Sequence, residues 1–582
     1  MNFGAEMRRY QDNYYNNNNM RGSIDIISFQ NFLLGESGTQ NGTGHSDLYE
    51  VTVASGVVQR YDRLRDFALF AQDSWKPVPR LTVNYGLRWE YIGLPVDIYG
   101  RNGAFDPRRY QAPAAGLSTS LGFVQEGNAR NPVPGIAKVS NTLTDKVGKL
   151  NFAPRIGLMM QMNKRMVMRA GYGLYYDRLS NQLGLLESLS LPNYVLSNQL
   201  NTTTGNQLNT SGSLSNPFPA LPLSSQFPVV PTLYSPTAVN APVPVSMNDI
   251  DPQMRTPYYQ QFGLNVQTEL TRFLMLEVGY VGANGKHLPV ETEINQALLA
   301  SPASPVNGQT SNAVSSTLRA PYLGFSNNGL LFLQTNTSSN YNSLQATLTE
   351  KLRTASLLAT YSYSKSMDTT SGSSDGSVFN NLSGDQTNQA QAYAPSDFNR
   401  THRLAGRFVQ PLPTPHWRIA RGTLGSRLFG GYEFSGTGIL QSGLPITISN
   451  AGGASYYGTD TSRASFAPGA TVATAILHGS PETRTTQYFN TAAFTGSGTT
   501  YGNTSRNMLV GPISRDFDLS LNKQTRIAES VMSEFRAQAF NITNTPTFAN
   551  PSSDEGAAST FGVISNTVGN PRILQFVLKI SF

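Results

Sequence analysis

The 582-residue chain has no cysteine and few charged residues, and each of these two features excludes certain kinds of protein. Without cysteine there is no disulfide, thiolate nucleophile or cysteine-bound metal. No stretch approaches the roughly 18 apolar residues that a membrane-spanning helix needs, which excludes a helical membrane protein. Charged residues make up 14% of the chain, well below the roughly 25% of soluble domains.

One architecture reconciles this low charge with a polar composition. The mean hydropathy is −0.29, and aromatics reach 10% of the chain, mostly Tyr and Phe. In a transmembrane β-barrel only every second strand residue faces lipid, so the mean hydropathy stays modest. Asn, Ser, Thr and Gly then fill the loops and the lumen. The composition therefore favours an all-β, transmembrane antiparallel β-barrel.

Alternation of apolar and polar residues recurs along the chain, as expected for strands with two different faces. Residues 81–91, for example, read Leu-Thr-Val-Asn-Tyr-Gly-Leu-Arg-Trp-Glu-Tyr. Many runs have the length of about ten residues that a tilted strand needs to cross a bilayer. We expect about sixteen strands. Other such runs lie at 168–176, 262–266, 274–280, 344–348, 357–363, 432–440, 517–522, 534–539 and 571–582.

The expected connections between strands alternate between short and long. Outer-membrane barrels have short periplasmic turns and long extracellular loops. Counting strands from the short turns places the end of the last strand on the short-turn side. Upstream of residue 60 the alternation is too weak to assign strands. The short connections are 76–79, 163–165, 270–272, 351–354 and 523–530, the intermediate one is 411–429, and the long ones are about 92–149, 178–256, 284–339, 367–399 and 443–514.

Short motifs add a more specific signal. Residues 70–90 read FAQDSWKPVPRLTVNYGLRWE, and similar pieces occur from Phe3 to Phe582. Together they resemble the barrel of Oar-like TonB-dependent receptors, of the type that contains a carboxypeptidase-regulatory-like domain. The other motifs are Asn151-Phe-Ala-Pro-Arg155, Arg169-Ala-Gly-Tyr-Gly173, Tyr341-Asn-Ser-Leu-Gln345, Tyr361-Ser-Tyr-Ser-Lys365, Asp397-Phe-Asn-Arg-Thr-His402, Gly443-Leu-Pro445 and Phe535-Arg-Ala-Gln-Ala-Phe-Asn541.

The resemblance implies a 22-stranded barrel that holds a plug, in the outer membrane of a Gram-negative-type bacterium. It also implies TonB-energised uptake of a large or scarce nutrient. About six strands, the plug, the regulatory-like domain and a signal peptide are not visible, so we expect residues 1–582 to be the C-terminal part of an N-terminally truncated barrel. The implied partners are outer-membrane lipid and lipopolysaccharide, the barrel-assembly machinery and, through the missing plug region, the TonB energy-coupling complex. The substrate and its binding residues cannot be carried over.

The last strand carries the strongest single functional signal. Its alternation ends in a terminal aromatic residue, which resembles the signal read by the outer-membrane assembly machinery. Such a strand offers an unpaired edge for β-augmentation together with a row of side-chain anchors. The simpler reading is an ordinary final strand that happens to end in Phe. The predicted assembly-signal residues are Phe576, Leu578, Ile580 and Phe582.

The sequence also predicts where aromatic residues and carboxylates of the strands lie. Aromatic residues near strand ends are expected to form an interfacial girdle; these are Trp75, Trp89, Tyr175 and Tyr176. Strand carboxylates are expected to face the lumen and to pair with arginines such as Arg88 and Arg536; these are Glu90, Glu269, Glu433 and Glu534.

Nothing in the sequence marks an enzyme. The five histidines lack metal-ligand spacing, and the G-x-S-x-G match at 372–376 lies in a Ser/Gly loop without the strand and helix that a hydrolase elbow requires. We predict no catalytic, cofactor or metal residues, and no basic block fits nucleic acid. Three alternatives remain: a passive porin-like channel, a secreted β-rich adhesin or structural protein, and a soluble β-rich enzyme.

Overall fold

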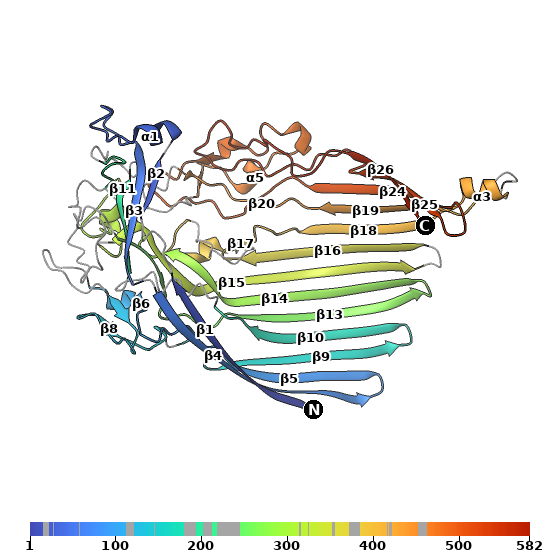
Figure 1. The fold of residues 1–582 in the computed structure, drawn as a ribbon, viewed down its shortest axis with the longest axis horizontal. Coiled ribbons are helices and arrows are strands. Elements are labelled where there is room, and N and C mark those ends of the chain that lie inside the picture. The colour runs from blue at the N-terminus through green and yellow to red at the C-terminus, as the bar shows by residue number, and fades with distance from the viewer. Residues whose placement is uncertain are drawn as a thin grey trace.

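The computed structural model describes most of the chain and shows one large curved sheet whose long loops gather at one end (Figure 1). The described residues are all except 16–21, 27, 58, 112–121, 145, 180–193, 202–211, 218–244, 314–315, 324, 352–354, 372–383, 416, 418–421 and 452–462. The predicted motif at 372–376 therefore lies outside the described residues.

The main sheet contains 16 strands, which agrees with the predicted number. Fourteen of them form an antiparallel meander in chain order, and two lie off this path: β12 (Val245–Ile250) pairs in parallel with β15, and β17 (Ala394–Pro395) pairs with β16. The meander consists of β1 (Asn2–Tyr15), β4 (Gln59–Val78), β5 (Leu81–Tyr91), β9 (Asn151–Asn163), β10 (Met166–Tyr176), β13 (Tyr258–Thr271), β14 (Leu274–Glu293), β15 (Phe325–Lys351), β16 (Ser356–Asp368), β18 (His402–Pro411), β19 (Tyr432–Gln441), β24 (Ser514–Arg526), β25 (Met532–Phe540) and β26 (Ile573–Ser581).

The remaining elements are small and lie mostly among the long loops. Among the described residues, no helix combines the length and apolar character needed to cross a membrane. The strands are β2 (Ser23–Ile26), β3 (Leu48–Gly56), β6 (Gly103–Phe105), β7 (Phe123–Gln125), β8 (Ala137–Lys138), β11 (Tyr194–Asn201), β20 (Pro445–Ile446), β21 (Ser465–Phe466), β22 (Phe494–Thr495) and β23 (Leu509–Val510), and the helices are α1 (Phe29–Leu34), η1 (Pro107–Arg109), η3 (Ser316–Arg319), η4 (Gln389–Ala392), α3 (Thr423–Phe429), α5 (Val472–Ala475), η6 (Pro481–Thr483) and η7 (Thr491–Ala493).

The strand register separates an apolar from a polar face. One rung across four strands is apolar and joins Phe434, Leu521, Ala537 and Phe576; the adjacent rung is polar and joins Ser435, Ser520, Gln538 and Gln575. Because successive strand residues point to opposite sides of a sheet, the polar rung faces away from the apolar one. The predicted two-faced strands are thus confirmed.

The predicted turn asymmetry is also confirmed, with one error. β4 and β5, β9 and β10, and β13 and β14 are each joined by two residues, and β26 ends on the same side (Figure 1). The connection between β18 and β19 carries helix α3. The prediction that 284–339 is one long loop is wrong, because β14 continues to Glu293 and pairs there with the long β15. A hairpin outside the bilayer is held by backbone hydrogen bonds and does not need an apolar face toward lipid. Its residues therefore need not alternate, and the sequence pattern did not reveal this extension.

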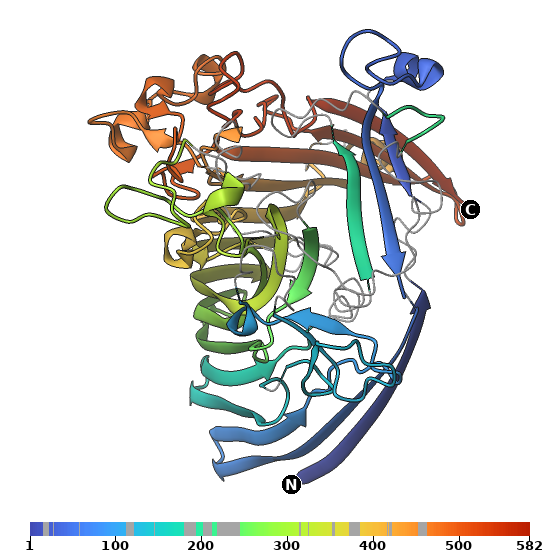
Figure 2. The same cartoon turned by 90° about the vertical axis from the view of Figure 1, so that its left-hand side faces the viewer.

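The sheet curves into a trough and does not meet itself. Within the described residues, β1 pairs only with β4, and β26 pairs only with β25. Figure 2 shows the two edges apart, with the β2–β3–β11 sheet beside the opening at the loop end. The predicted antiparallel all-β sheet is thus confirmed, with β1 and β26 as its two edges among the described strands.

The buried apolar clusters lie among the long loops. Phe105, Phe123, Phe325 and Phe332 form one such cluster, and Phe489 and Phe561 belong to a second. Large apolar residues of the sheet are exposed instead: Leu87 is 49% exposed and Leu264 is 47% exposed. A sheet with a bare apolar face and a separate, packed loop region is what a lipid-embedded wall with external loops requires.

Replacing Leu521 with Arg is expected to impair membrane assembly. Leu521 is 38% exposed and lies on the apolar face in the middle of β24. An Arg near the bilayer midplane costs ~2–4 kcal/mol. The measurement is heat-modifiable migration of the protein on gels. The matched control is Ser520→Arg, one residue away on the opposite face, which should retain the folded band. A folded band of normal intensity for Leu521→Arg would contradict the lipid-facing assignment.

Candidate functional site

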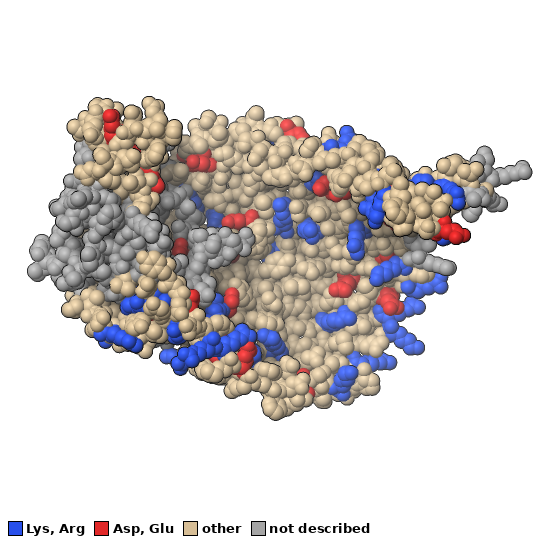
Figure 3. Space-filling model, in the orientation of Figure 1, with Lys and Arg blue, Asp and Glu red and all other residues tan. Residues whose placement is uncertain are grey.

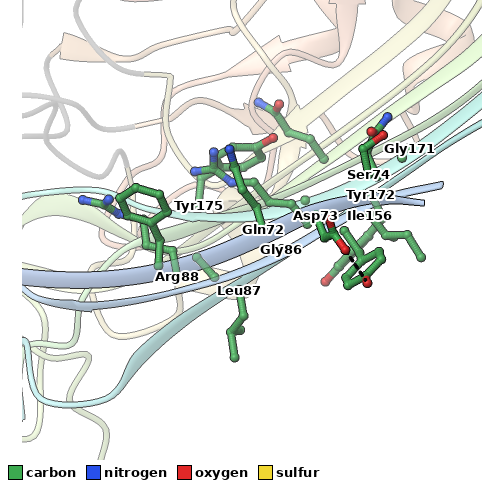
Figure 4. A pocket seen from close by; sticks show the side chains of 18 of the residues that line it. Gln72, Asp73, Ser74, Gly86, Leu87, Arg88, Ile156, Gly171, Tyr172 and Tyr175 are labelled. Carbon is green, nitrogen blue, oxygen red and sulfur yellow. Dashed lines mark hydrogen bonds between the residues drawn. The ribbon is translucent and has the colours of Figure 1, made fainter. Parts of the chain in front are cut away.

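The concave face of the first six meander strands contains a hollow of about 1110 Å³. It is bordered by these six strands, β1, β4, β5, β9, β10 and β13, and by Val281 of the next strand, β14 (Figure 4). Figure 4 shows Arg88, Gln72 and Tyr175 on one side of the wall, whereas Leu87 and Tyr172 point away on the other. The wall is a single sheet, so residues of both faces border the hollow.

Glycines widen the hollow. Gly157, Gly171 and Gly263 occupy one rung on three successive strands. A Cβ added at Gly157 or Gly171 would meet only one atom each, at 3.9 and 3.8 Å, so packing does not demand glycine at these two positions. The missing side chains leave the inner surface open at this level.

An arginine stacked on a tyrosine projects beside the hollow. The Arg155 guanidinium lies 4.4 Å from the centre of the Tyr175 ring, and that ring lies across Gly173, the register partner of Arg155. The prediction that Tyr175 belongs to the aromatic girdle is therefore wrong. A shift of one residue along a strand reverses the face, and Tyr175 shares the inner face with Gly171 and Gly173.

The outward aromatic positions agree better with the prediction. Trp75 is 57% exposed and pairs with Val83 next to the short turn. Trp89 alternates with the inward Arg88, and Tyr176 follows the inward Tyr175. By strand alternation these three residues fall on the apolar face, and their place in a girdle stays a prediction.

The inner face also carries the predicted ion pairs. Arg88 contacts both Glu6 of β1, at 2.9 Å, and Glu90 of its own strand. Arg536 donates to Glu534 at 2.5 Å. The pairing of strand carboxylates with Arg88 and Arg536 is therefore confirmed for Glu90 and Glu534. These partly exposed pairs set the charge pattern of the inner face rather than its stability.

Of the predicted assembly-signal residues, Phe576, Leu578 and Ile580 lie on the outer face of the edge strand β26, and Phe582 directly follows its last residue. All four are exposed, from 52% for Ile580 to 67% for Phe576 and 97% for Phe582; Leu578 lies between them on the same face. Phe576 stacks on Phe535 of β25 with ring centres 6.3 Å apart. The edge and its apolar row are thus accessible together.

A buried arginine, which sequence reasoning did not single out, joins one long loop to the sheet. Arg506 is only 7% exposed and contacts Asp368 at the end of β16 and, at 3.0 Å, Asp397. Asn507 donates to the same Asp397 carboxylate and to the carbonyl of Pro395 at 2.7 Å. The partners are more than a hundred residues apart, so no local pattern could have identified them.

A second buried polar cluster lies in the loops before β9. Glu126 accepts hydrogen bonds from the backbone N–H of Asp97 at 3.2 Å and from the side chain of Asn102 at 3.2 Å. Arg60 donates to Asn102, and Arg101 forms an ion pair with Asp97 at 2.7 Å. The pKa of the Glu126 carboxyl is raised from 4.5 to about 8; burial is the main cause and the Asp97 carboxylate adds to the rise, whereas the hydrogen bonds oppose it.

These groups do not form a metal centre. Among the described residues, no cluster of three or more histidines or carboxylates could hold a metal ion. The loop charges are arranged instead as ion pairs and hydrogen bonds within the loop region.

Comparison with known proteins decides the family. A family model described as an outer membrane beta barrel domain matches residues 1–575. The chain belongs to this family. The outer-membrane β-barrel assignment explains the bare apolar face and places the protein in the outer membrane. No curated protein matches the chain.

Several solved structures are similar to this outer-membrane barrel at low identity. The outer membrane transporter YddB from Escherichia coli is 13% identical, with a TM-score of 0.37, and the match covers 90% of this chain and 55% of that chain. The FrpB iron transporter from Neisseria meningitidis is 8% identical, with a TM-score of 0.39, and the match covers 100% and 51%. The ferric enterobactin receptor PfeA from Pseudomonas aeruginosa is 11% identical, with a TM-score of 0.40, and the match covers 90% and 46%. The chain thus spans about half the length of these proteins.

The loop cluster around Glu126 should lose stability as the pH rises. Its folded-state pKa of about 8 exceeds the usual 4.5, so the folded loop binds a proton that the unfolded loop has released. Stability is then greatest below 4.5 and falls until the pH reaches about 8. Limited proteolysis of the loops across this range measures the effect. Glu126→Gln should make the profile shallower and leave the smaller slope that is due to Asp62, whose pKa burial raises to about 6. An equally steep profile for Glu126→Gln would contradict the assignment to this carboxyl.

Proposed function

We propose that this outer-membrane β-barrel is part of an Oar-like TonB-dependent receptor that takes up a large or scarce nutrient. The observation that carries the proposal is a wide trough with an apolar outer face, a charged and polar inner face, and two edges that pair with no further strand among the described residues. A wide barrel filled by a separate folded domain accounts for both the width and the polar inner face. The motifs at 70–90 and their companions add the Oar-like resemblance.

Residues 1–582 form, in this proposal, the C-terminal part of the barrel. The signal peptide, the regulatory-like domain, the plug and the remaining strands are encoded upstream. Hydrocarbon offers no hydrogen bonds, so the open edges of β1 and β26 require partners in the membrane. Strands supplied from upstream would pair with these edges and close the wall.

The inner face would then contact the plug. Arg88 with its two carboxylates and Arg155 on Tyr175 present fixed charges where an inserted domain would lie. Charged groups held in place on a wall favour a partner of complementary pattern. The long loops, tied down by contacts such as Arg506 with Asp368, would surround the substrate at the entrance, and the TonB complex would act on the plug from the other side. No enzymatic step is part of the proposal.

A passive porin-like channel is the second candidate. The hollow beside Arg155, open on the concave side of the sheet, favours it. Polar and charged side chains on that face suit a water-filled passage as well as they suit a plug. The two candidates differ in whether solute movement depends on energy from the inner membrane.

The deciding experiment compares the reading frame extended upstream of Met1 with residues 1–582 alone, in the source bacterium. The proposal expects the extended form to support growth on a limiting nutrient, and expects this growth to disappear when the TonB gene is deleted. Growth that persists without TonB, together with ion conductance of the purified chain in planar bilayers, would favour the passive channel. An upstream frame that encodes no plug would overturn the receptor proposal.

We further propose that Phe576, Leu578, Ile580 and Phe582 form the signal through which the barrel-assembly machinery recognises the chain. The exposed edge of β26 can accept an added strand, and the alternating apolar side chains supply anchors on one face. Phe582, at 97% exposure, has the most surface available to a partner.

Deleting Phe582 is expected to lower the yield of folded protein in the outer membrane severalfold. The loss removes an anchor whose burial contributes about 1.5–3 kcal/mol. Immunoblots of outer-membrane fractions measure the yield. Phe582→Tyr keeps an aromatic end and should assemble normally, which controls for chain length. Equal yields of the deleted and complete chains would remove Phe582 from the signal.

A further inference from the structure

Basic side chains gather at the short-turn end of the sheet. Figure 3 shows blue side chains along the right-hand edge, over the ends of the strands that the short turns join. Each of the six strand connections at this end has at least one basic residue in it or directly beside it. We call the following described residues the turn belt: Arg80, Lys164, Arg165, Arg272, Lys351, Arg427 and Arg526.

The turn belt is exposed and nearly free of opposite charge. All seven side chains are exposed. In the same connections and their directly flanking residues, Glu529 is the one acidic residue among those described. Glu350, directly beside Lys351, is a second acidic residue at this level and shares the outer face with its register partner Leu274, whereas Glu269, Glu433 and Glu534 lie at strand positions on the inner face. The outward edge therefore has a positive charge of its own.

Within the part of the chain that the structure describes, basic residues form ion pairs at the long-loop end of the molecule but not in the turn belt. At the long-loop end several arginines form ion pairs with carboxylates, as in Arg101 with Asp97 and Arg108 with Asp106, both at 2.7 Å, and others, such as Arg319, donate to backbone carbonyls. Among the described residues, none of the seven turn-belt side chains forms an ion pair. Seven like charges without internal counter-charges require an external partner or solvent.

Aromatic rings lie directly beside the belt. Arg272 lies 4.4 Å from the ring centre of Phe273. Lys523, three residues before Arg526 on β24, lies 4.1 Å from the ring centre of Tyr432. Trp75 is exposed on the outer face near Arg80. Aromatic rings and basic groups at one level mark the boundary between hydrocarbon and headgroups.

We propose that the turn belt binds the acidic phospholipid headgroups of the leaflet that borders the short turns. Phosphate oxygens accept hydrogen bonds from Arg and Lys, with Arg well suited to bidentate contact. The belt continues the apolar outer face, so a lipid whose chains cover that face places its headgroup at the belt. The lipid surface also explains why these charges form no ion pair with the residues that the structure describes. This inference rests on the membrane assignment and holds whether the barrel transports actively or passively.

The test measures which lipids the full chain retains. The chain is reconstituted in vesicles of phosphatidylethanolamine with added phosphatidylglycerol, extracted in mild detergent, and its lipids are counted by mass spectrometry. Phosphatidylglycerol should be enriched over the vesicle composition, and high salt should remove the enrichment. Each basic group near an anionic surface strengthens attraction by a factor of roughly five. Lys164→Ser with Arg165→Ser should therefore lower the enrichment roughly 25-fold.

Two controls keep the result specific. Lys146→Ser with Lys149→Ser removes two exposed lysines from the long-loop end and should leave the enrichment unchanged. Lys164→Arg with Arg165→Lys should also keep it. If the variant Lys164→Ser with Arg165→Ser does not fold, as judged by heat-modifiable migration on gels, the variant Arg80→Ser with Arg272→Ser provides the same test. The proposal would be overturned if both serine variants of the turn belt retained the phosphatidylglycerol enrichment of the unaltered chain. It would also be overturned if Lys146→Ser with Lys149→Ser lost as much enrichment as they do.

Discussion

Backbone hydrogen bonding in a medium without water is the constraint on which this structure depends. Every N–H and C=O within hydrocarbon needs a partner in the protein, and a long antiparallel meander supplies partners for all but its outermost rows. The same constraint explains the uneven distribution of the core. The wall needs no packed interior because lipid covers its apolar face, whereas the loops, which lie in water, bury Phe105, Phe489 and their neighbours.

Charge follows the same division. In the loops, burial brings opposite charges together, as in Arg506 with Asp368 and Arg101 with Asp97. On the inner wall, Arg88 is held between Glu6 and Glu90. At the short turns, nothing buries the basic side chains, and they stay unmatched within the described chain. Each environment therefore leaves its own pattern of pairing.

The strands were predictable because alternation is local. The run at 81–91 coincides with β5, and the end of the last strand lies on the side that the turn count indicated. The extension of β14 and β15 was missed because it pairs in water, where composition need not alternate. Tyr175 was misplaced because an error of one residue reverses the face. The cluster around Arg506 and the hollow beside Arg155 are formed by residues that are far apart in the sequence and meet only after folding. No spacing in the sequence predicts them.

The directions of the two edge strands, β1 and β26, limit the number of strands that can be added between them to close the barrel. β1 runs from the short-turn end toward the loops, since Asn2 pairs with Gln72 and Tyr15 with Gln59. β26 runs the opposite way, with Ser581 opposite Met532. If every neighbour is antiparallel, only an even number of added strands can join these two edges. Whole hairpins satisfy this parity, and a single inserted strand, from this chain or any other, would leave one seam with the wrong polarity.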